Sequence, residues 1–414
     1  MLSRLKRRAL RALKWLLRGE QFKHYTRPNP APAPGPRLRI GVVFLIPLLG
    51  DAVMLFPLLD ALREHNPDAE ITAFVSGMGK VLRLHPAVDR VFERPPRSRL
   101  SSRLWPVGDI ASLWLWWFRQ LRAVRLDVCV MLRCGSDPFY GTHLAWLLGA
   151  PVRAGYDAAL EPERLHHDLD ASALLTHEVT AMKAVHEVDR GSEVLELAGL
   201  LPAPVDSRRP STGLLAIASA SEARQFVASY PQLSQPYFIL SPGASVPLKE
   251  WPETGYAEVA RYLVPRGWLP VVVGGPEVHV AGDRIASALN MPVLSLAGKT
   301  DFAQLAAVCA GARLFIGNDS GTGHVAGAVG TPAVVLSSYA ASNPAVHQTS
   351  PLRTHPAGPC HAIVQPLRPL PPCAGECTAS TPHCITQIEV AAVIAAVENL
   401  LAGREAVEVS SVHA

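Results

Sequence analysis

The chain has 414 residues and carries 39 lysines and arginines against 35 aspartates and glutamates, which gives a formal net charge of +4 at pH 7. Residues 1–27 hold nine of the basic side chains and one acidic side chain, so the rest of the chain is slightly acidic and is not expected to bind nucleic acid. Seven cysteines do not make a disulfide framework in a chain of this size, and neither a cleavable signal nor a long uninterrupted apolar run is evident. We therefore expect two α/β domains in the reducing cytosol, with no membrane-spanning segment.

The N-terminal residues predict a membrane-binding tail. Residues 1–18 place six leucines and Trp15 among arginines and lysines at roughly helical spacing. This pattern is typical of an amphipathic helix that lies on an anionic membrane surface, although a dispensable solvated helix or a targeting remnant is the alternative. Residues 28–36, PNPAPAPGP, predict a stiff extended linker, so residues 1–36 are assigned to a tail and linker outside the folded body.

The first domain is predicted to cover residues 37–205. It begins with a buried strand at residues 38–46 and a helix at residues 52–64, followed by a second strand at residues 70–75. The Gly50-Asp51 pair therefore lies in a strand-to-helix turn, which is where ligands bind in open parallel sheets.

Arginine and tryptophan are concentrated in residues 94–125 of this domain. Trp105, Trp114, Trp116 and Trp117 surround a short apolar helix. This composition predicts a second membrane-facing patch or part of a groove for a lipid-linked acceptor. The alternative is that residues 113–118 are ordinary core.

The second domain is predicted to cover residues 206–400, after a proline-rich and polar boundary at residues 200–212, and residues 401–414 are expected to be a flexible terminus. A strand at residues 237–240 leads into a loop that contains Ser241, Ser245 and Lys249. A lysine with several hydroxyls and N–H groups at the carboxyl end of a strand forms an anion cradle. The alternative is a surface lysine in a solvated turn.

Residues 314–336 carry the clearest pattern of a binding site. Two short buried strands, residues 314–317 and 333–336, flank the run Asp319-Ser320-Gly321-Thr322-Gly323-His324. Gly321 and Gly323 are expected to permit positive φ angles and a close ligand approach. The small-residue helix that they open would direct its N–H groups and its dipole at a phosphate.

Two other interpretations of this stretch were weighed. A dinucleotide-binding fingerprint does not fit, because the third glycine comes one residue late and no acid follows about twenty residues later to bind a ribose. A purely structural tight turn explains the glycines, but it does not explain Asp319, Ser320 and His324 together.

These motifs resemble glycosyltransferase family 9, the lipopolysaccharide heptosyltransferases. The residues from Asp319 to His324 are similar to the family's D-S/T-G-x-x-H signature, and a G-x-P-x-V strand follows them. The run that begins at Gly50-Asp51 and the segment from Ser241 to Pro252, with its PGAS and K-x-W-P motifs, also match in the right order. The resemblance covers roughly residues 38–400 and implies an α/β fold of the GT-B type, with two Rossmann-like domains whose parallel sheets face across a cleft.

By this resemblance the protein is an inverting enzyme that transfers a heptose, or a closely related sugar, from an ADP-sugar to a growing lipopolysaccharide core. The implied partners are a nucleotide-sugar donor, a lipid-linked oligosaccharide acceptor and the anionic surface of the inner membrane. The implied location is the cytoplasmic face of that membrane, with peripheral attachment. No cofactor and no metal ion is expected, because Lys249 and a helix N-terminus would supply the positive charge at the leaving diphosphate.

The resemblance also implies a role for each site residue. Asp51 would be the general base that takes the proton of the acceptor hydroxyl, and Lys249 would neutralise the charge that develops on ADP. Asp319 and His324 would position sugar hydroxyls or phosphate, and Glu277 would reach the ribose or the base. The predicted donor-binding residues are Ser241, Gly243, Ser245, Lys249, Glu277, Asp319, Ser320, Gly321, Thr322 and His324.

The cysteines near the C-terminus form a separate pattern. Three residues separate Cys373 from Cys377, six separate Cys377 from Cys384, and Cys360 lies further back. Four thiolates can hold zinc, but this spacing is not that of a zinc knuckle, and the cysteine-bearing C-terminus of the family needs no metal. No metal site is therefore expected here.

Two other functions remain open at this stage. A non-hydrolysing nucleotide-sugar epimerase shares the two-domain architecture, but it would need additional acid/base groups near the sugar and no membrane-binding tail. A nucleotide-sugar-binding protein without turnover is the other alternative, and the presence of both Asp51 and Lys249 argues against it.

Overall fold

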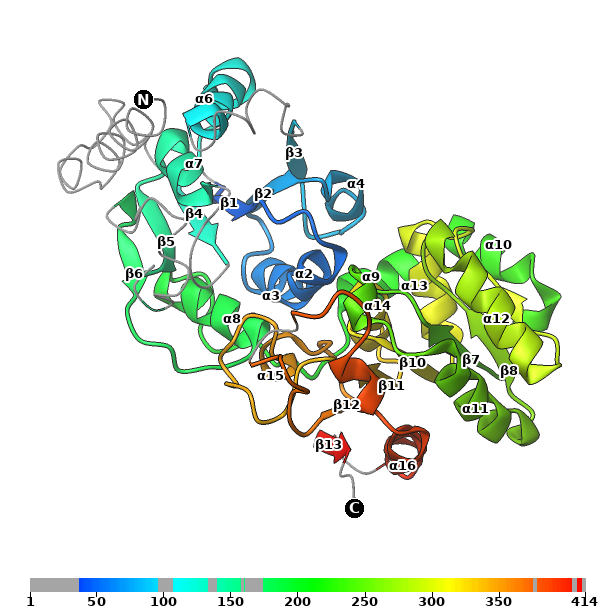
Figure 1. The fold of residues 1–414 in the computed structure, drawn as a ribbon. Coiled ribbons are helices and arrows are strands. Elements are labelled where there is room, and N and C mark those ends of the chain that lie inside the picture. Colours follow the sequence, from blue (N-terminus) through cyan, green and yellow to red (C-terminus); the bar gives the residue numbers. More distant parts are fainter. Residues whose placement is uncertain are drawn as a thin grey trace. The chain divides into compact units, whose positions relative to one another are not determined.

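The computed structural model describes residues 37–95, 107–132, 140–157, 160, 174–374, 378–403 and 408–411. The predicted tail helix, the proline-rich linker, Trp105 and Cys377 lie outside these residues. The described chain divides into two compact units (Figure 1). The first contains the residues up to Leu48 together with Leu58–Val205, and the second contains Leu49–Pro57 and the residues from Asp206 onward.

The first unit is built on a parallel sheet of six strands. The strand order is β3-β2-β1-β4-β5-β6, so the order reverses between β1 and β4. The strands are β1 (Arg39–Phe44), β2 (Glu70–Ser76), β3 (Arg90–Arg94), β4 (Val128–Met131), β5 (Val152–Tyr156) and β6 (His177–Val179). The helices are α3 (Phe56–His65), α4 (Gly79–Leu82), α6 (Val107–Trp116), α7 (Gly141–Leu148) and α8 (Glu187–Leu197).

The helix predicted at residues 52–64 is wrong in one respect, because the structure has two helices there. The first is α2 (Leu49–Met54), and α3 begins at Phe56 after a break at Leu55. Proline lacks the backbone N–H that a helix interior requires, but the first turn of a helix tolerates it. Pro57 therefore fits at the second position of α3, and a continuous helix does not form.

The second unit is built on a parallel sheet of seven strands in the order β13-β12-β11-β10-β7-β8-β9. The strands are β7 (Tyr237–Ser241), β8 (Leu269–Val272), β9 (Leu294–Ser295), β10 (Leu314–Asn318), β11 (Ala333–Leu336), β12 (His361–Pro366) and β13 (Glu408–Ser411). All side chains of β7, β10 and β11 are buried, as is typical of a parallel sheet that has helices on both faces.

Two layers of helices cover this second sheet (Figure 1). Contacts join α11, α12 and α16 in one group, and they join α9, α10, α13, α14 and α2 in the other. The bounds are α9 (Thr212–Ala218), α10 (Ser221–Ala228), α11 (Glu253–Leu263), α12 (His279–Leu289), α13 (Phe302–Gly311), α14 (Gly321–Ala328), α15 (Pro351–Thr354) and α16 (Val390–Leu401). Asp301 begins α13 with a capping box, in which its side chain accepts from the N–H of Gln304 and the Gln304 side chain accepts in return.

The α/β class with parallel sheets that the sequence predicted is therefore confirmed. Each sheet has the doubly wound order of a Rossmann fold, in which the chain starts at a central strand, adds strands on one side and then crosses to the other. The strands expected at residues 314–317 and 333–336 are β10 and β11.

The tryptophan-rich segment is partly core and partly surface. Leu113 and Trp116 are buried, whereas Trp114, Leu115 and Phe118 are 43%, 47% and 56% exposed. The segment continues from α6 into a short π-helical turn at Trp117–Leu121. The core interpretation thus holds for the buried face, and the membrane-facing or acceptor-groove interpretation of the exposed face stays a prediction.

A pH-dependent stability is expected from His143, which is buried in α7. Neither ring nitrogen has a hydrogen-bond partner among the described residues, and burial lowers the pKa of His143 from 6.5 to about 4. Below pH 6.5 the unfolded chain takes up a proton that the folded chain does not, so stability is complete above 6.5 and falls as the pH falls towards 4. The loss should approach about 1.4 kcal/mol per pH unit and total about 3 kcal/mol.

Urea unfolding followed by tryptophan fluorescence between pH 7 and pH 4 would measure this loss. His143→Leu should remove about this much of the pH dependence, whereas His279→Leu, which changes an exposed histidine, should leave it unaltered. An unchanged pH dependence in His143→Leu would contradict the assignment.

Candidate functional site

The candidate site lies where the strand order of the second sheet reverses. Strands β7 and β10 are neighbours in this sheet but are distant in sequence, with β8 beyond β7 and β11 beyond β10. Because the connections on the two sides of such a point lead to opposite faces, a crevice forms at the carboxyl ends of the strands. All ten predicted donor-binding residues lie at the end of β7, β8 or β10 or in the segment that follows.

An ion pair joins the segments that follow β7 and β10. Nζ of Lys249 lies 3.2 Å from Oδ2 of Asp319. Lys249 ends a short 3-10 turn, Pro247–Lys249, and Asp319 follows β10 directly, where its N–H donates to the carbonyl of Leu336 at 2.9 Å. Both side chains stay partly exposed, at 26% and 17%, so a ligand can reach them.

Hydroxyl groups link β7 to the first turn of α14. Oγ of Ser241 shares a hydrogen bond of 2.7 Å with Oγ1 of Thr322, and Oγ of Ser320 shares one of 2.8 Å with the same atom. The structure therefore brings together Ser241, Ser320 and Thr322, which the sequence predicted as donor-binding residues in two separate segments. The first N–H groups of α14 have no partner within the helix, and the helix dipole adds partial positive charge at this end.

The positive φ angles expected for Gly321 and Gly323 are wrong, whereas the expected close approach of a ligand stays a prediction. Neither residue has a positive φ angle; Gly321 is the first residue of α14 and Gly323 is the third. The small size of Gly321 is needed for another reason, because a Cβ atom there would lie 2.9 Å from Cβ of Leu49. This glycine allows α2 to approach α14 closely.

The contact between α2 and α14 also depends on a glycine of α2, Gly50. A Cβ atom on Gly50 would lie 2.7 Å from Cδ2 of His324, so the imidazole packs directly on the backbone of α2. The next residue is Asp51, which lies half-buried in the first turn of α2. Asp51 was predicted to belong to the first domain, whereas the structure groups Leu49–Pro57 with the second unit, through the contact between α2 and α14.

His324 is held in its neutral form. Burial lowers its pKa below the ordinary value of 6.5; Asp319 opposes this shift, and the nearby charge of Lys249 adds to it. Its Nδ1 atom is buried without a hydrogen-bond partner among the described residues. A neutral imidazole at this position can donate or accept one hydrogen bond with a ligand, but it does not contribute a full positive charge.

Asn318, the last residue of β10, has a structural role that was not predicted from the sequence. Its Oδ1 accepts from the N–H of Trp251 at 3.0 Å and its Nδ2 donates to the carbonyl of Pro242 at 2.5 Å, and the side chain is fully buried. The amide therefore ties both ends of the loop that carries Lys249 to the strand that leads to Asp319. The sequence feature that could have indicated this role is a polar residue at the end of an apolar strand. A buried polar side chain in such a position needs hydrogen-bond partners.

Gly243, Ser245 and Glu277 lie at the periphery of this network. A Cβ atom on Gly243 would lie 2.6 Å from Cγ2 of Val278, so this glycine permits close contact between the segments that follow β7 and β8. Ser245 and Glu277 are exposed, and neither bonds to Lys249 or Asp319 among the described residues. Burial raises the pKa of Glu250, and the charges of Glu253 and Glu277 add to this rise, so acidic groups gather on this side.

Comparisons with known proteins agree with the family resemblance and with the fold. The family described as glycosyltransferase family 9 (heptosyltransferase) matches residues 114–365. Lipopolysaccharide heptosyltransferase 3 of Escherichia coli is 26% identical over 295 residues, which cover 69% of this chain and 80% of that protein.

Two solved structures share the fold. The Escherichia coli ADP-heptose lps heptosyltransferase II has a TM-score of 0.63 at 22% identity and covers 88% of this chain and 99% of that chain. The Escherichia coli heptosyltransferase WaaC has a TM-score of 0.53 at 20% identity and covers 74% of this chain and 89% of that chain. The family match covers more than half of the sequence. The parallel α/β architecture of the two units and the site where the strand order of the second sheet reverses agree with this match. The chain therefore belongs to glycosyltransferase family 9, the heptosyltransferases, and is a glycosyltransferase.

Proposed function

We propose that the protein transfers a heptose, or a closely related sugar, from ADP-heptose to a lipopolysaccharide core acceptor with inversion at the anomeric carbon. The observation that carries this proposal is the ion pair of Lys249 and Asp319 beside the N-terminus of α14. Membership in the heptosyltransferase family supports the sugar, and the WaaC structure with ADP supports the nucleotide.

The diphosphate of the donor is the leaving group, and its negative charge grows as the bond to the sugar breaks. Lys249 and the N–H groups at the start of α14 provide positive charge there before the reaction begins. Ser241, Ser320 and Thr322 add hydroxyl donors around the same point. Groups that are already oriented need no reorganisation during the reaction, and such preorganisation is usually the largest contribution to catalysis.

Asp51 is proposed as the general base. A carboxylate can take the proton of an acceptor hydroxyl as its oxygen attacks the anomeric carbon from the face opposite the diphosphate. Attack from that face inverts the configuration. The position of Asp51 in α2, which packs on α14, supports its assignment to the same site as the donor-binding residues.

The remaining predicted residues are assigned to binding. Asp319 and His324 would orient sugar hydroxyls or phosphate, and Glu277 would bind the ribose or the base. Residues 206–400 would bind the donor and residues 37–205 the acceptor. In this scheme Lys249 and the helix N-terminus provide the positive charge at the diphosphate, so transfer needs no added cofactor.

Incubation with ADP-heptose, with and without a lipid-A-core acceptor, tests the proposal directly. Transfer of heptose to the acceptor is the expected result, and the anomeric configuration of the product reports inversion or retention. An epimerised donor in the absence of acceptor would instead indicate an epimerase. Donor binding without either reaction would indicate a binding protein.

Asp51→Asn should lower turnover by about two to four orders of magnitude and leave donor affinity nearly unchanged, because the amide cannot accept the proton. Steady-state rates and calorimetric titration with ADP measure the two effects. Asp283→Asn, which neutralises an exposed acid on α12, is the matched control and should retain full turnover. Near wild-type turnover in Asp51→Asn would remove Asp51 from the mechanism.

Lys249→Ala should weaken ADP binding by about 1.5–3 kcal/mol, the scale of a hydrogen bond to a charged group. Lys299→Ala makes the same change of charge on an exposed lysine of the same unit, whose Nζ donates to the carbonyl of Ser295, and should leave ADP affinity unaltered. Equal affinities of the Lys249→Ala variant and the wild type would show that the diphosphate binds elsewhere.

We also propose that the enzyme binds reversibly to the cytoplasmic face of the inner membrane. Within the described residues, no helix combines the length and apolar character that crossing a bilayer requires. The exposed aromatic side chains at the end of α6 lie beside exposed arginines, and the guanidinium of Arg122 lies 5.1 Å from the ring of Phe118. Aromatic and basic side chains together are typical of surfaces that bind anionic membranes.

Deletion of residues 1–36 should abolish sedimentation with anionic vesicles and leave transfer to a short soluble acceptor nearly intact. Each basic side chain near an anionic surface contributes about 1 kcal/mol, so the tail would dominate binding, and added salt should weaken it. Phe118→Ser in the full chain is the comparison for the α6 surface. Vesicle binding that survives the deletion and is lost in Phe118→Ser would move the membrane contact to α6.

A further inference from the structure

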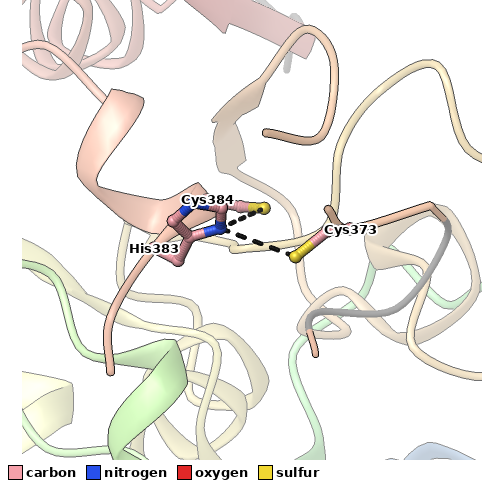
Figure 2. A group of neighbouring side chains, drawn as sticks. All are labelled: Cys373, His383 and Cys384. Atoms are coloured by element: carbon pink, nitrogen blue, oxygen red, sulfur yellow. Dashed lines mark hydrogen bonds between the residues drawn. The ribbon is translucent and has the colours of Figure 1, made fainter. Parts of the chain in front are cut away.

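Three side chains with metal-binding atoms converge in the segment between β12 and α16. Nδ1 of His383 lies 3.5 Å from Sγ of Cys373 and 3.8 Å from Sγ of Cys384, and all three atoms lie within 4.8 Å of one another. Figure 2 shows both sulfur atoms directed at the same ring nitrogen. Cys373 and Cys384 are buried and His383 is partly exposed.

We propose that Cys373, His383 and Cys384 bind a zinc ion that stabilises the C-terminal part of the second unit. The expectation of no metal rested on the spacing of the cysteines and on the resemblance to a family whose cysteine-bearing C-terminus needs no metal, and it did not include His383. Cys377, which that spacing includes, lies outside the described residues, and the proposal assigns it no role. The proposal is independent of the proposed transfer reaction.

The distances fit zinc. With Zn–S bonds of about 2.3 Å and Zn–N bonds of about 2.0 Å, a tetrahedral ion holds a sulfur and a nitrogen ligand about 3.6 Å apart. The two observed separations, 3.5 and 3.8 Å, are close to this value before any ion is placed. Sulfur and imidazole ligands in a tetrahedral arrangement favour zinc over magnesium or calcium, which prefer oxygen ligands.

Hydrogen bonding alone explains this arrangement less well. A ring nitrogen carries either one proton or one lone pair, so Nδ1 of His383 cannot satisfy two sulfur atoms equally. Cys373 and Cys384 do not form a disulfide with each other. A cation between the three atoms would interact favourably with both thiolates and with the imidazole lone pair.

A backbone donor supports the thiolate form of Cys373. The N–H of Thr378 donates to Sγ of Cys373 at 3.4 Å, and Oγ1 of Thr378 lies 3.9 Å from the same atom. Groups that donate to a ligand atom orient it and stabilise its charged form, which is the form that binds metal.

The ion would hold a segment that has little other regular structure. Apart from the 3-10 turn Cys384–Gln387, the described residues between β12 and α16 form no helix or strand. Nε2 of Gln387 donates to the carbonyl of Arg368 at 3.1 Å, which adds a polar link between the two ends of this segment. A site that joins Cys373 to Cys384 would therefore fix the segment much more firmly.

Metal analysis of tag-free full-length protein tests the proposal. The wild type should contain about one zinc ion per chain. After zinc is removed by a chelator, cobalt should bind with the intense visible bands of a tetrahedral thiolate site. Cys373→Ser and Cys384→Ser should lose both the zinc and the cobalt spectrum. Cys360→Ser, which changes a partly exposed thiol of the same unit, should keep both.

Thermal unfolding of the wild type keeps the test decisive if the cysteine variants do not fold. Removal of zinc should lower the melting temperature, and added zinc, but not magnesium, should restore it. The proposal fails if chelated wild type binds neither zinc nor cobalt, or if Cys373→Ser and Cys384→Ser bind as much metal as Cys360→Ser. It also fails if protein purified without oxygen contains a Cys373–Cys384 disulfide.

Discussion

The amide of Asn318 holds the Lys249 loop on the end of β10, and the geometry of the candidate site depends on this contact. A lysine in a long loop would otherwise lose considerable conformational entropy each time it bound a diphosphate. Asn318 and Asp319 are consecutive, so the group that fixes the loop and the carboxylate that pairs with Lys249 come from the same strand end. The ammonium is thereby positioned before a ligand arrives, which is the condition for electrostatic preorganisation.

The close crossing of α2 and α14 has two effects at once. Gly50 lets the ring of His324 pack on one backbone, and Gly321 lets Leu49 pack on the other. Burial of His324 in this contact lowers its pKa and so favours the neutral imidazole beside Lys249, and the same contact holds Asp51 next to α14. Substitution of either glycine would therefore be expected to disturb the positions of both Asp51 and His324.

The parallel sheets could be predicted from the sequence, and the signature from Asp319 to His324 could be recognised in it, because both depend on local patterns. Apolar runs mark β7, β10 and β11, and the polar residues that follow them meet because the carboxyl ends of parallel strands share one edge. The break between α2 and α3, the packing role of Gly321 and the bonds of Asn318 were not predicted. The packing role of Gly321 and the bonds of Asn318 depend on partners far away in the chain, Leu49 and Trp251, and no local pattern encodes those distances. His383 was missed for the same reason, because it approaches Cys373 only after the segment folds back. The break between α2 and α3, in contrast, follows from the nearby Pro57.

Trp251 connects the loop that carries Lys249 to the C-terminal segment through two N–H groups that donate hydrogen bonds. Its backbone N–H donates to Asn318, and its indole Nε1 donates to the carbonyl of Ile388 at 2.9 Å, four residues after Cys384. Ile385 and Ile388 belong to the same buried core as Trp251. Water therefore cannot replace the Ile388 carbonyl as the acceptor of the indole N–H. A displacement of the C-terminal segment would leave a buried donor unpaired, at a cost of about 1–3 kcal/mol. The conformation of the loop that carries Lys249 therefore depends on the conformation of the segment that carries Cys384. Neither segment lies in a strand or an α-helix.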